Sequence, residues 1–410
     1  MEHFLEKAKS ASRTLATLSG SERNRILREM AEALRANTMN IIEANAIDMR
    51  HAEEENLSSS LKDRLLLNEK RIEAMAVAIE EIAALKDPIG RVLEGWVTET
   101  GLKIEKVSIP IGVIGIIYES RPNVTSDTAA LCFKSSNGCV LKGGKEAESS
   151  NKIIADVLQQ VLIRNALPKE LVALLPDASR EGVAKLIKMD KYVDLIVPRG
   201  GEALIRFVSQ NATVPVVKHD KGQCHLYVHA QAKIEDALQI AINAKVQRPS
   251  ACNAIETLLI DDAIAQEVLP LFKEVFDREN TVLKGCPLTR QIIEVAEATD
   301  EDFDTEYLAN ILNIRVVDGI EGAISHIVRF GSGHSESIIT ENITAAERFM
   351  NAIDAAAVYV NASTRFTDGG EFGFGAEVGI STNKLHARGP MGVEGLTTYK
   401  YKIYGKGQVR

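Results

Sequence analysis

From Gly112 onward, short apolar runs alternate with segments whose apolar residues have helical spacing, and this alternation constrains the fold most. The apolar runs are continuous, which is typical of strands buried on both faces. Strands of this kind, separated by helices, form a parallel sheet covered on both sides. The first series predicts strands over 113–117, 139–142, 171–175, 193–197 and 214–217, with helices over 147–163, 180–187 and 201–208.

A second alternating series after Ala230 predicts a second α/β domain. The residues before Gly112 predict helices that pack on the first domain, and Asp87-Pro88 ends the last of them, because a proline disfavours helix at the preceding residue. A chain of 410 residues is long for one core, which also favours two or three domains. The second series comprises helices over 234–243 and 263–276 and strands over 257–260, 314–317, 337–340 and 357–360.

Composition excludes several classes of protein. The formal net charge of -9 argues against non-specific binding to nucleic acid or to an anionic membrane. No apolar run approaches membrane-spanning length, and the first residues lack the pattern of a secretory signal. The 5 cysteines are an odd number and widely spread, which favours a reducing compartment without a disulfide framework or a metal cluster. We therefore expect a cytoplasmic protein that acts on a small molecule and holds no metal.

Cys252 is the residue that most strongly indicates chemistry. It lies in a turn just before the apolar run 257–260, so it can be presented at the rim of a sheet. A small buried apolar residue is the alternative reading of any cysteine. The polar neighbours Gln247, Arg248 and Asn253 favour an accessible thiol instead, and such a thiol can form a thioester with an acyl group.

Two glycine turns follow predicted strands and precede predicted helices, at 141–145 and 198–202. Each puts backbone N–H groups and cations at a helix start, which is an anion site, although ordinary turns with solvated cations would look the same. The dinucleotide fingerprint GxGxxG is absent. Asn123 can donate to an oxyanion or cap a helix, and His219 can act as a base or bind a carbonyl.

Several blocks of the sequence, in order, resemble the aldehyde dehydrogenase superfamily, and within it the gamma-glutamyl phosphate reductases. The superfamily resemblance is carried by residues 121–123, 141–142, the Cys252 turn and 305–308; the narrower one by 246–254, 304–308, 331–336 and 361–375. It covers essentially the whole chain. It implies an α/β, aldehyde dehydrogenase-like fold with a Rossmann-type NADP-binding domain (1–95 and 108–229), an α/β catalytic domain (230–368) and a small oligomerisation extension (96–107 and 385–410).

The resemblance implies that NADPH is the cofactor and assigns five residues to it. Lys142 binds the adenosine ribose and, with Lys145 as a helper, the 2′-phosphate. The helix start at Gly200 and Gly201 faces the cofactor phosphates, and Glu306 holds the nicotinamide ribose.

The resemblance also assigns the catalytic pair. Cys252 is the nucleophile, and Asn123 forms the oxyanion hole with the backbone N–H of Cys252. For the substrate, arginine forks suit a carboxylate and a phosphate, and a glutamate suits an ammonium group, with surface salt bridges as the alternative for each. The candidates for binding the substrate are Glu119, Arg121, Arg248, His334, Ser363, Thr364 and Arg365.

One departure from the superfamily narrows the expected reaction. The glutamate that activates hydrolytic water in ordinary aldehyde dehydrogenases is missing from the block 217–224, where His219 lies nearest its place. The resemblance therefore implies NADPH-dependent reduction of L-glutamyl 5-phosphate to L-glutamate 5-semialdehyde and phosphate, through a cysteine thioester, as the second step of proline biosynthesis. A homo-oligomer (dimer or tetramer) and a complex with glutamate 5-kinase are the expected partners. A dehydrogenase that passes the acyl group to coenzyme A and a non-catalytic ligand-binding protein are the alternatives.

Overall fold

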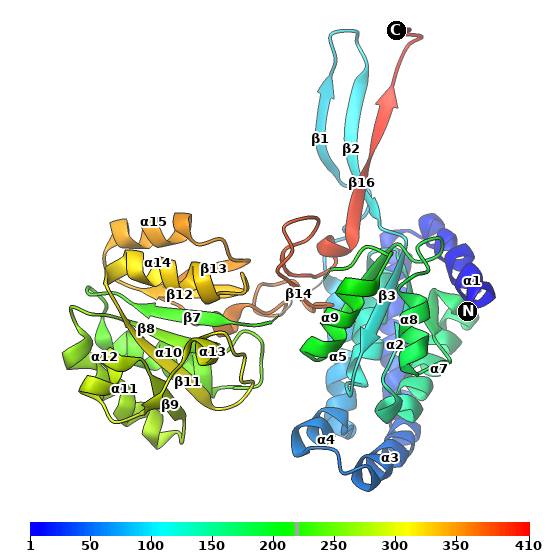
Figure 1. Ribbon diagram of the computed structural model, residues 1–410. Helices are drawn as coiled ribbons and strands as arrows, with labels where there is room; N and C mark the ends of the chain where they lie inside the picture. Colours follow the sequence, from blue (N-terminus) through cyan, green and yellow to red (C-terminus); the bar gives the residue numbers. More distant parts are fainter. Residues whose placement is uncertain (218–220) are drawn as a thin grey trace. The chain divides into compact units, whose positions relative to one another are not determined.

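The computed structural model describes residues 1–217 and 221–410 and divides the chain into two compact units, each of the α/β class (Figure 1). Within the described residues, no helix combines the length and the apolar character that crossing a membrane requires. Unit 1 consists of Met1–Lys218, Gly373–Gly379 and Pro390–Arg410, and unit 2 of His219–Phe372 and Ile380–Gly389.

Unit 1 contains a four-stranded parallel sheet in the order β5-β4-β3-β6. The chain passes from β3 to β4 on one side and later places β6 on the other side of β3. This reversal creates a switch point at the carboxyl ends of β3 and β6, where parallel sheets bind ligands. Four of the five expected strands are confirmed as β3 (Val113–Tyr118), β4 (Gly138–Lys142), β5 (Val172–Leu174) and β6 (Leu195–Arg199).

The expected strand over 214–217 is wrong. Only an isolated bridge forms there, between Ile196 and Val216. Ile196 donates its N–H to the carbonyl of Pro215 (2.8 Å) and accepts from Val217 (3.0 Å). The preceding hydrogen bond of a parallel ladder would have to come from the backbone N–H of Pro215, and proline has no backbone N–H.

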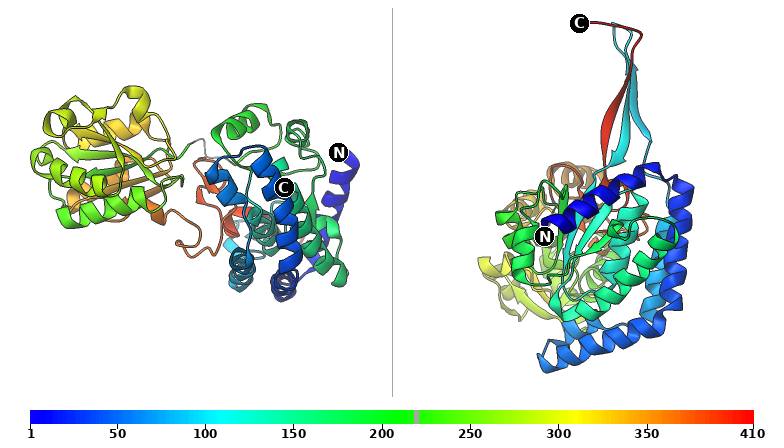
Figure 2. Two further views of the ribbon diagram at one scale, coloured as in Figure 1. Left: turned by 90° about the horizontal axis from the view of Figure 1, so that it is seen from below. Right: turned by 90° about the vertical axis from the view of Figure 1, so that its right-hand side faces the viewer.

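The helices of unit 1 pack on this sheet and on each other, and the right-hand view of Figure 2 shows the long N-terminal helices along one side of the unit. Leu5 and Ala8 of α1 join a core with Val113, Ile117 and Val140 of the sheet. The helices are α1 (Glu2–Ser12), α2 (Gly20–Ala36), α3 (Thr38–Glu54), α4 (Ser59–Leu65), α5 (Glu69–Ala84), α6 (Asn123–Lys134), α7 (Glu148–Arg164), α8 (Arg180–Leu186) and α9 (Glu202–Asn211).

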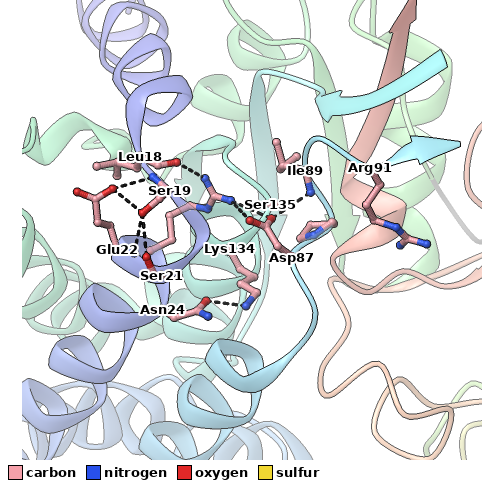
Figure 3. Close-up of polar contacts among 12 residues, drawn as sticks. Leu18, Ser19, Ser21, Glu22, Asn24, Asp87, Ile89, Arg91, Lys134 and Ser135 are labelled. Carbon is pink, nitrogen blue, oxygen red and sulfur yellow. Dashed lines mark hydrogen bonds and ion pairs between the residues drawn. The ribbon is translucent and has the colours of Figure 1, made fainter. Parts of the chain in front are cut away.

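A buried ammonium group fixes the carboxyl end of α6 (Figure 3). Lys134 is 1% exposed, and its Nζ donates to Asn24 Oδ1 (2.6 Å) and to the carbonyls of Ala83 (3.0 Å) and Leu85 (2.6 Å). Burial lowers the pKa of Lys134 to about 8, so the group is still charged at neutral pH. One side chain therefore ties α6 to α2 and to the end of α5.

Unit 2 is built on a seven-stranded sheet in the order β10-β9-β11-β8-β7-β12-β13, and all the pairs are parallel. The strands are β7 (Cys224–Val228), β8 (Ile255–Asp261), β9 (Val282–Gly285), β10 (Ala296–Glu297), β11 (Ile311–Val317), β12 (Ser335–Ile339) and β13 (Ala357–Val360). The helices are α10 (Ile234–Val246), α11 (Ala265–Arg278), α12 (Pro287–Ile292), α13 (Asp300–Phe303), α14 (Gly319–Phe330) and α15 (Ile343–Ala352).

Successive side chains of this sheet point into two different cores, as strand geometry requires. Leu226 and Leu258 pack with α10 and α11 on one face, whereas Tyr227 and Leu259 pack with α14 and α15 on the other. Figure 1 shows these helix pairs on opposite sides of the sheet. The predicted strands and helices of the second series are confirmed.

Two predicted boundaries are wrong. Residues 224–228 were expected in the NADP-binding domain, but as β7 they pair with β8 and β12 in unit 2. Cys224 and His225 open that run, so the sequence does not look like a buried strand. Residues 385–389, expected in the extension, also belong to unit 2, close to β14 (Ile380–Ser381). The roles assigned to the units stay a prediction.

A three-stranded antiparallel ribbon projects from unit 1 in both figures. It joins β1 (Val92–Val97) and β16 (Thr397–Tyr404) to the central β2 (Lys103–Pro110), and these strands overlap the segments expected to form the extension, 96–107 and 385–410. All of β1 is exposed, including Val97 at 67%, and Ile403 on β16 is 59% exposed. This ribbon carries apolar side chains that unit 1 does not bury.

The Lys134 cluster predicts a large loss of stability. Lys134→Met keeps the volume but leaves one buried and two part-buried oxygens without this donor, so we expect the free energy of unfolding to fall by about 2–4 kcal/mol. Urea unfolding followed by fluorescence and circular dichroism measures this change. Lys185→Met, which removes only the exposed pair with Glu181, is the control and should leave the midpoint unchanged. Equal midpoints for both variants would contradict the assignment.

Candidate active site

The predicted residues of unit 1 gather at the carboxyl edge of its sheet. Glu119 follows β3, Lys142 ends β4, and Gly200 and Gly201 follow β6, which lies beside β3. Glu119 Oε2 accepts the Gly201 N–H at 3.0 Å, and its charge acts on Lys142. A Cβ on Gly200 would lie 2.5 Å from that carboxylate oxygen, so a larger residue there would push the Glu119 side chain aside. Three of the residues predicted to bind the cofactor, Lys142, Gly200 and Gly201, thus lie at this edge of the sheet.

Internal carboxylates bind backbone N–H groups near both predicted anion sites, and ligand binding at these sites stays a prediction. At the start of α7, Asp48 accepts the N–H groups of Ser149 (3.1 Å) and Ser150 (2.7 Å). At the start of α9, Glu119 occupies the Gly201 N–H. The chain fills both positions with its own carboxylates, because a helix start favours negative charge.

The two lysines after β4 point in different directions. Lys142 is almost fully buried, donates to the carbonyl of Ala178 (2.7 Å) and has its pKa lowered by burial. Lys145 is exposed and pairs with Glu55 of α3 at 2.8 Å. Lys142 is therefore held at the sheet edge, whereas Lys145 forms the surface pair that the sequence left open as the alternative.

Asn123 is exposed at the first turn of α6 and is not a side-chain cap of that helix. Its Nδ2 donates to Asp127 Oδ2, one helical turn later, at 2.9 Å. Burial raises the pKa of Asp127 to about 6. Arg121 lies half-buried in the same loop.

In unit 2, Cys252 lies in a turn between α10 and β8 that its neighbours hold closely. It is half-buried, and the other four cysteines are buried. The Cys252 carbonyl accepts from the Cys224 thiol at 3.3 Å. A Cβ on Gly222 would lie 2.0 Å from the same oxygen, so no other residue fits at 222. Burial raises the pKa of Cys224 well above its usual range, so Cys224 remains a neutral donor.

Two arginines surround this turn. Arg365 donates to Gln247 Oε1 at 3.0 Å and also to the side-chain oxygen of Asn253. Burial and then the charge of Arg248 lower the pKa of Arg365, while the charge of Cys252 raises it. The predicted nucleophile and two predicted substrate-binding cations therefore lie within electrostatic range of each other, and cations favour a thiolate.

Three further residues predicted to bind substrate are buried and contact the residues around the Cys252 turn. Ser363, Thr364 and His334 are all buried. Thr364 donates to the Asn253 carbonyl (2.6 Å), and the Ser363 hydroxyl accepts from the Arg365 N–H (3.2 Å). His334 Nδ1 lies 3.6 Å from Cys224 Sγ. These contacts hold the turn and Arg365 in place.

Glu306 lies in the loop between α13 and β11, beside a buried ion pair. Lys245 Nζ and Glu256 Oε2 are 2.7 Å apart, and both side chains are shielded from solvent. Burial, with a smaller contribution from the charge of Glu306, raises the pKa of Glu256 to about 7 against the lowering effect of Lys245. Burial also lowers the pKa of Lys245. The loop is anchored to this pair because the Leu308 N–H donates to Glu256 Oε1 at 3.3 Å.

Comparisons with known proteins identify the family. Residues 1–282 match the model of the aldehyde dehydrogenase family. The chain belongs to the aldehyde dehydrogenase family. It is 75% identical to the gamma-glutamyl phosphate reductase of Sulfurovum sp. (strain NBC37-1) and covers 100% of both chains. The crystal structure of that reductase from Thermotoga maritima superposes with a TM-score of 0.97 at 47% identity, covering 100% of this chain and 99% of the other.

A more distant structure shares only the fold. An engineered glycolyl-CoA reductase with bound NADP+ has a TM-score of 0.69 at 15% identity and covers 98% of this chain and 96% of that one. The resemblance drawn from the sequence blocks is thus confirmed for the family and for the fold class.

Sequence reasoning missed several residues of this aldehyde dehydrogenase-family site. Gly222 and Cys224 were read only as members of a block that lacks a glutamate, and Asp127 was not considered. A signal for Asp127 was present, because an acceptor four residues after an asparagine on a helix can bind its amide. His219, the residue nearest the missing glutamate, lies outside the described residues.

Differential alkylation tests which cysteine is reactive. We expect iodoacetamide to modify Cys252 first and to abolish turnover, because Cys252 is the least buried thiol and lies beside two arginines. Cys286 is the matched control. Burial raises its pKa, but hydrogen bonds with Thr289, Val316 and Leu288 together lower the pKa overall. Iodoacetamide should inactivate the Cys286→Ser variant at the wild-type rate, and peptide mapping should locate the first alkylated residue at Cys252. Primary alkylation at Cys286 would contradict the assignment.

Proposed function

We propose that this chain reduces L-glutamyl 5-phosphate to L-glutamate 5-semialdehyde with NADPH and releases phosphate. One observation carries the proposal: a half-buried cysteine lies in a tightly held turn beside Arg365 and Arg248, in a chain related over its full length to gamma-glutamyl phosphate reductases. The reaction would be the second step of proline biosynthesis in the cytoplasm, where cysteines stay reduced.

In the first step the Cys252 thiolate attacks the γ-acyl carbon. A C–S bond forms, and the carbonyl electrons move to oxygen. Asn123 donates an N–H to this oxyanion, and donors of this kind typically contribute about 10²–10³ in rate. When the carbonyl reforms, the C–O bond to phosphate breaks and phosphate leaves with the electron pair. Arg248 and Arg365 suit the phosphate and the carboxylate of the substrate, because guanidinium groups bind such anions with two hydrogen bonds.

In the second step the thioester is reduced. NADPH, when bound, supplies the hydride and thus the two electrons. The acyl carbon takes the hydride, the C–S bond breaks, and Cys252 regains its electron pair as the aldehyde leaves. Asn123 serves the oxyanion in this step as well. Glu119 is our candidate for the substrate ammonium group.

The residues at the edge of the unit 1 sheet suit an anionic dinucleotide. The Gly201 N–H already donates to a carboxylate oxygen, so the position takes an anion, and Lys142 supplies a cation one strand away from Glu119. We propose that Lys142 binds the adenosine ribose, that the start of α9 faces the phosphates once Glu119 turns aside, and that Glu306 holds the nicotinamide ribose. Lys145 is kept as a helper for the 2′-phosphate. The NADP+ seen in a protein of the same fold supports this class of cofactor.

The ribbon of β1, β2 and β16 supports a homo-oligomer. Its exposed apolar side chains include Trp96, Val97, Tyr401 and Ile403. Apolar patches of this kind mark protein–protein contacts. We propose that a second copy of the chain covers the ribbon. A complex with glutamate 5-kinase stays a prediction from the sequence.

The acyl acceptor tests the proposed reaction. With glutamate 5-semialdehyde and NADP as substrates, we expect NADPH formation to require added phosphate and to be abolished in Cys252→Ala. Cys286→Ser is the control and should retain wild-type turnover. Turnover with coenzyme A in place of phosphate would favour the acylating alternative. Turnover with neither acceptor, giving free glutamate, would indicate hydrolysis, and comparing NAD with NADP settles the cofactor.

The ribbon makes a separate prediction about assembly. Val97→Lys combined with Ile403→Lys places charges on β1 and β16, and burying them against a partner is unfavourable. Sedimentation should show an oligomer for the wild type and a monomer for this variant. Replacing exposed Val328 of α14 by lysine is the control and should leave the oligomer intact. An unchanged oligomer in the double variant would place the interface elsewhere.

A further inference from the structure

We propose that Asp127 is a positioning residue for Asn123: its carboxylate fixes the Asn123 amide so that one N–H remains directed at the reacting carbonyl oxygen. The inference rests on the proposed function, because it assigns a task to the residue that would serve the oxyanion. Both residues belong to α6 in unit 1, so the argument needs only the geometry of one helix.

The contacts form a small network on the first turns of α6. Asn123 Nδ2 donates to Asp127 Oδ2 at 2.9 Å. The Ser126 hydroxyl lies 3.2 Å from Asp127 Oδ1 and donates to the Asn123 carbonyl at 2.9 Å. Residues four apart lie on one face of a helix, so the helix itself places the carboxylate beside the amide.

The chemistry of the two groups determines the orientation of the amide. An ionised carboxylate only accepts hydrogen bonds, so it must face the NH₂ group of Asn123 and not its oxygen. The NH₂ group has two N–H bonds. One is used by Asp127, and the second points away in a fixed direction. Asn123 is exposed while Asp127 is half-buried, so this second N–H is the one that a substrate can reach.

Protonation of Asp127 would remove this control. Burial raises the pKa of Asp127 to about 6, against the lowering effects of Asn123, Ser126 and the charge of Arg199 at the end of β6. A protonated carboxyl can donate to the amide oxygen, which stabilises the flipped amide. The flipped amide places an oxygen lone pair where the N–H was, and this lone pair repels an oxyanion.

A double-mutant cycle separates positioning from a merely structural role. We expect Asp127→Asn to lower kcat of the phosphate-dependent reaction about tenfold at pH 7.5, with KM values changed less than about twofold, since one oxyanion donor is worth about 10²–10³. In an Asn123→Ala background the same substitution should have no further effect, because the residue to be positioned is gone. Thermal unfolding of each variant shows whether the fold is kept.

The pH dependence of rate ratios gives a second readout. The ratio of wild-type to Asp127→Asn turnover should fall from about ten at pH 7.5 toward one at pH 5, because wild type loses the carboxylate. Ionisation of the substrates cancels in this ratio. The ratio of wild-type to Asn123→Ala turnover should fall over the same pH range. This second ratio can be measured even if no variant at position 127 folds.

Three outcomes would overturn the inference: an equal effect of Asp127→Asn in both backgrounds, ratios that do not change with pH, or Asp127→Asn turnover equal to wild type. A wild-type enzyme without phosphate-dependent turnover would instead overturn the proposed function.

Discussion

The Cys252 turn depends on a backbone contact that leaves no room for a side chain. The carbonyl of Cys252 lies where a Cβ of residue 222 would be, only 2.0 Å away, and it also accepts a hydrogen bond from the Cys224 thiol. Thr364 holds the next carbonyl of the same turn. β7, β8 and the segment after β13 therefore meet at one peptide. Cys252 and Arg365 owe their positions to this junction, so the proposed chemistry depends on it.

A second theme is that the chain satisfies its strong electrostatic positions with its own groups. Asp48 accepts backbone N–H groups at the start of α7, and Glu119 accepts one at the start of α9. Lys134 donates to the carbonyls at the end of α5. The polar groups that we propose for ligands are those whose internal partner uses only part of their hydrogen-bonding capacity or can move away. Asn123 keeps a second N–H beyond its bond to Asp127, and the Glu119 side chain can rotate away from Gly201. The proposed ligand sites are positions where an internal partner leaves part of the bonding capacity unused.

The sequence predicted most of the fold because buried parallel strands are continuous apolar runs. It failed where a strand departs from that pattern: β7 begins with Cys224 and His225, and Pro215 prevents a ladder that the apolar residues around it suggest. The candidate site was predicted in part. Cys252, Arg248 and Arg365 do lie together, but Ser363, Thr364 and His334 are buried supports. Which side chain fills a helix start depends on contacts across about 100 residues, as with Asp48 and Ser150, and no local pattern encodes such a contact.

The central claim is that an acyl group resides on Cys252 until phosphate takes it. Rapid mixing of the enzyme with glutamate 5-semialdehyde and NADP in phosphate-free buffer tests this claim most directly. The account predicts a burst of about one NADPH per active subunit that then stops, with a glutamyl group found by mass spectrometry on the peptide containing Cys252. Continued turnover without an acceptor, or an acyl group on any other residue, would contradict it.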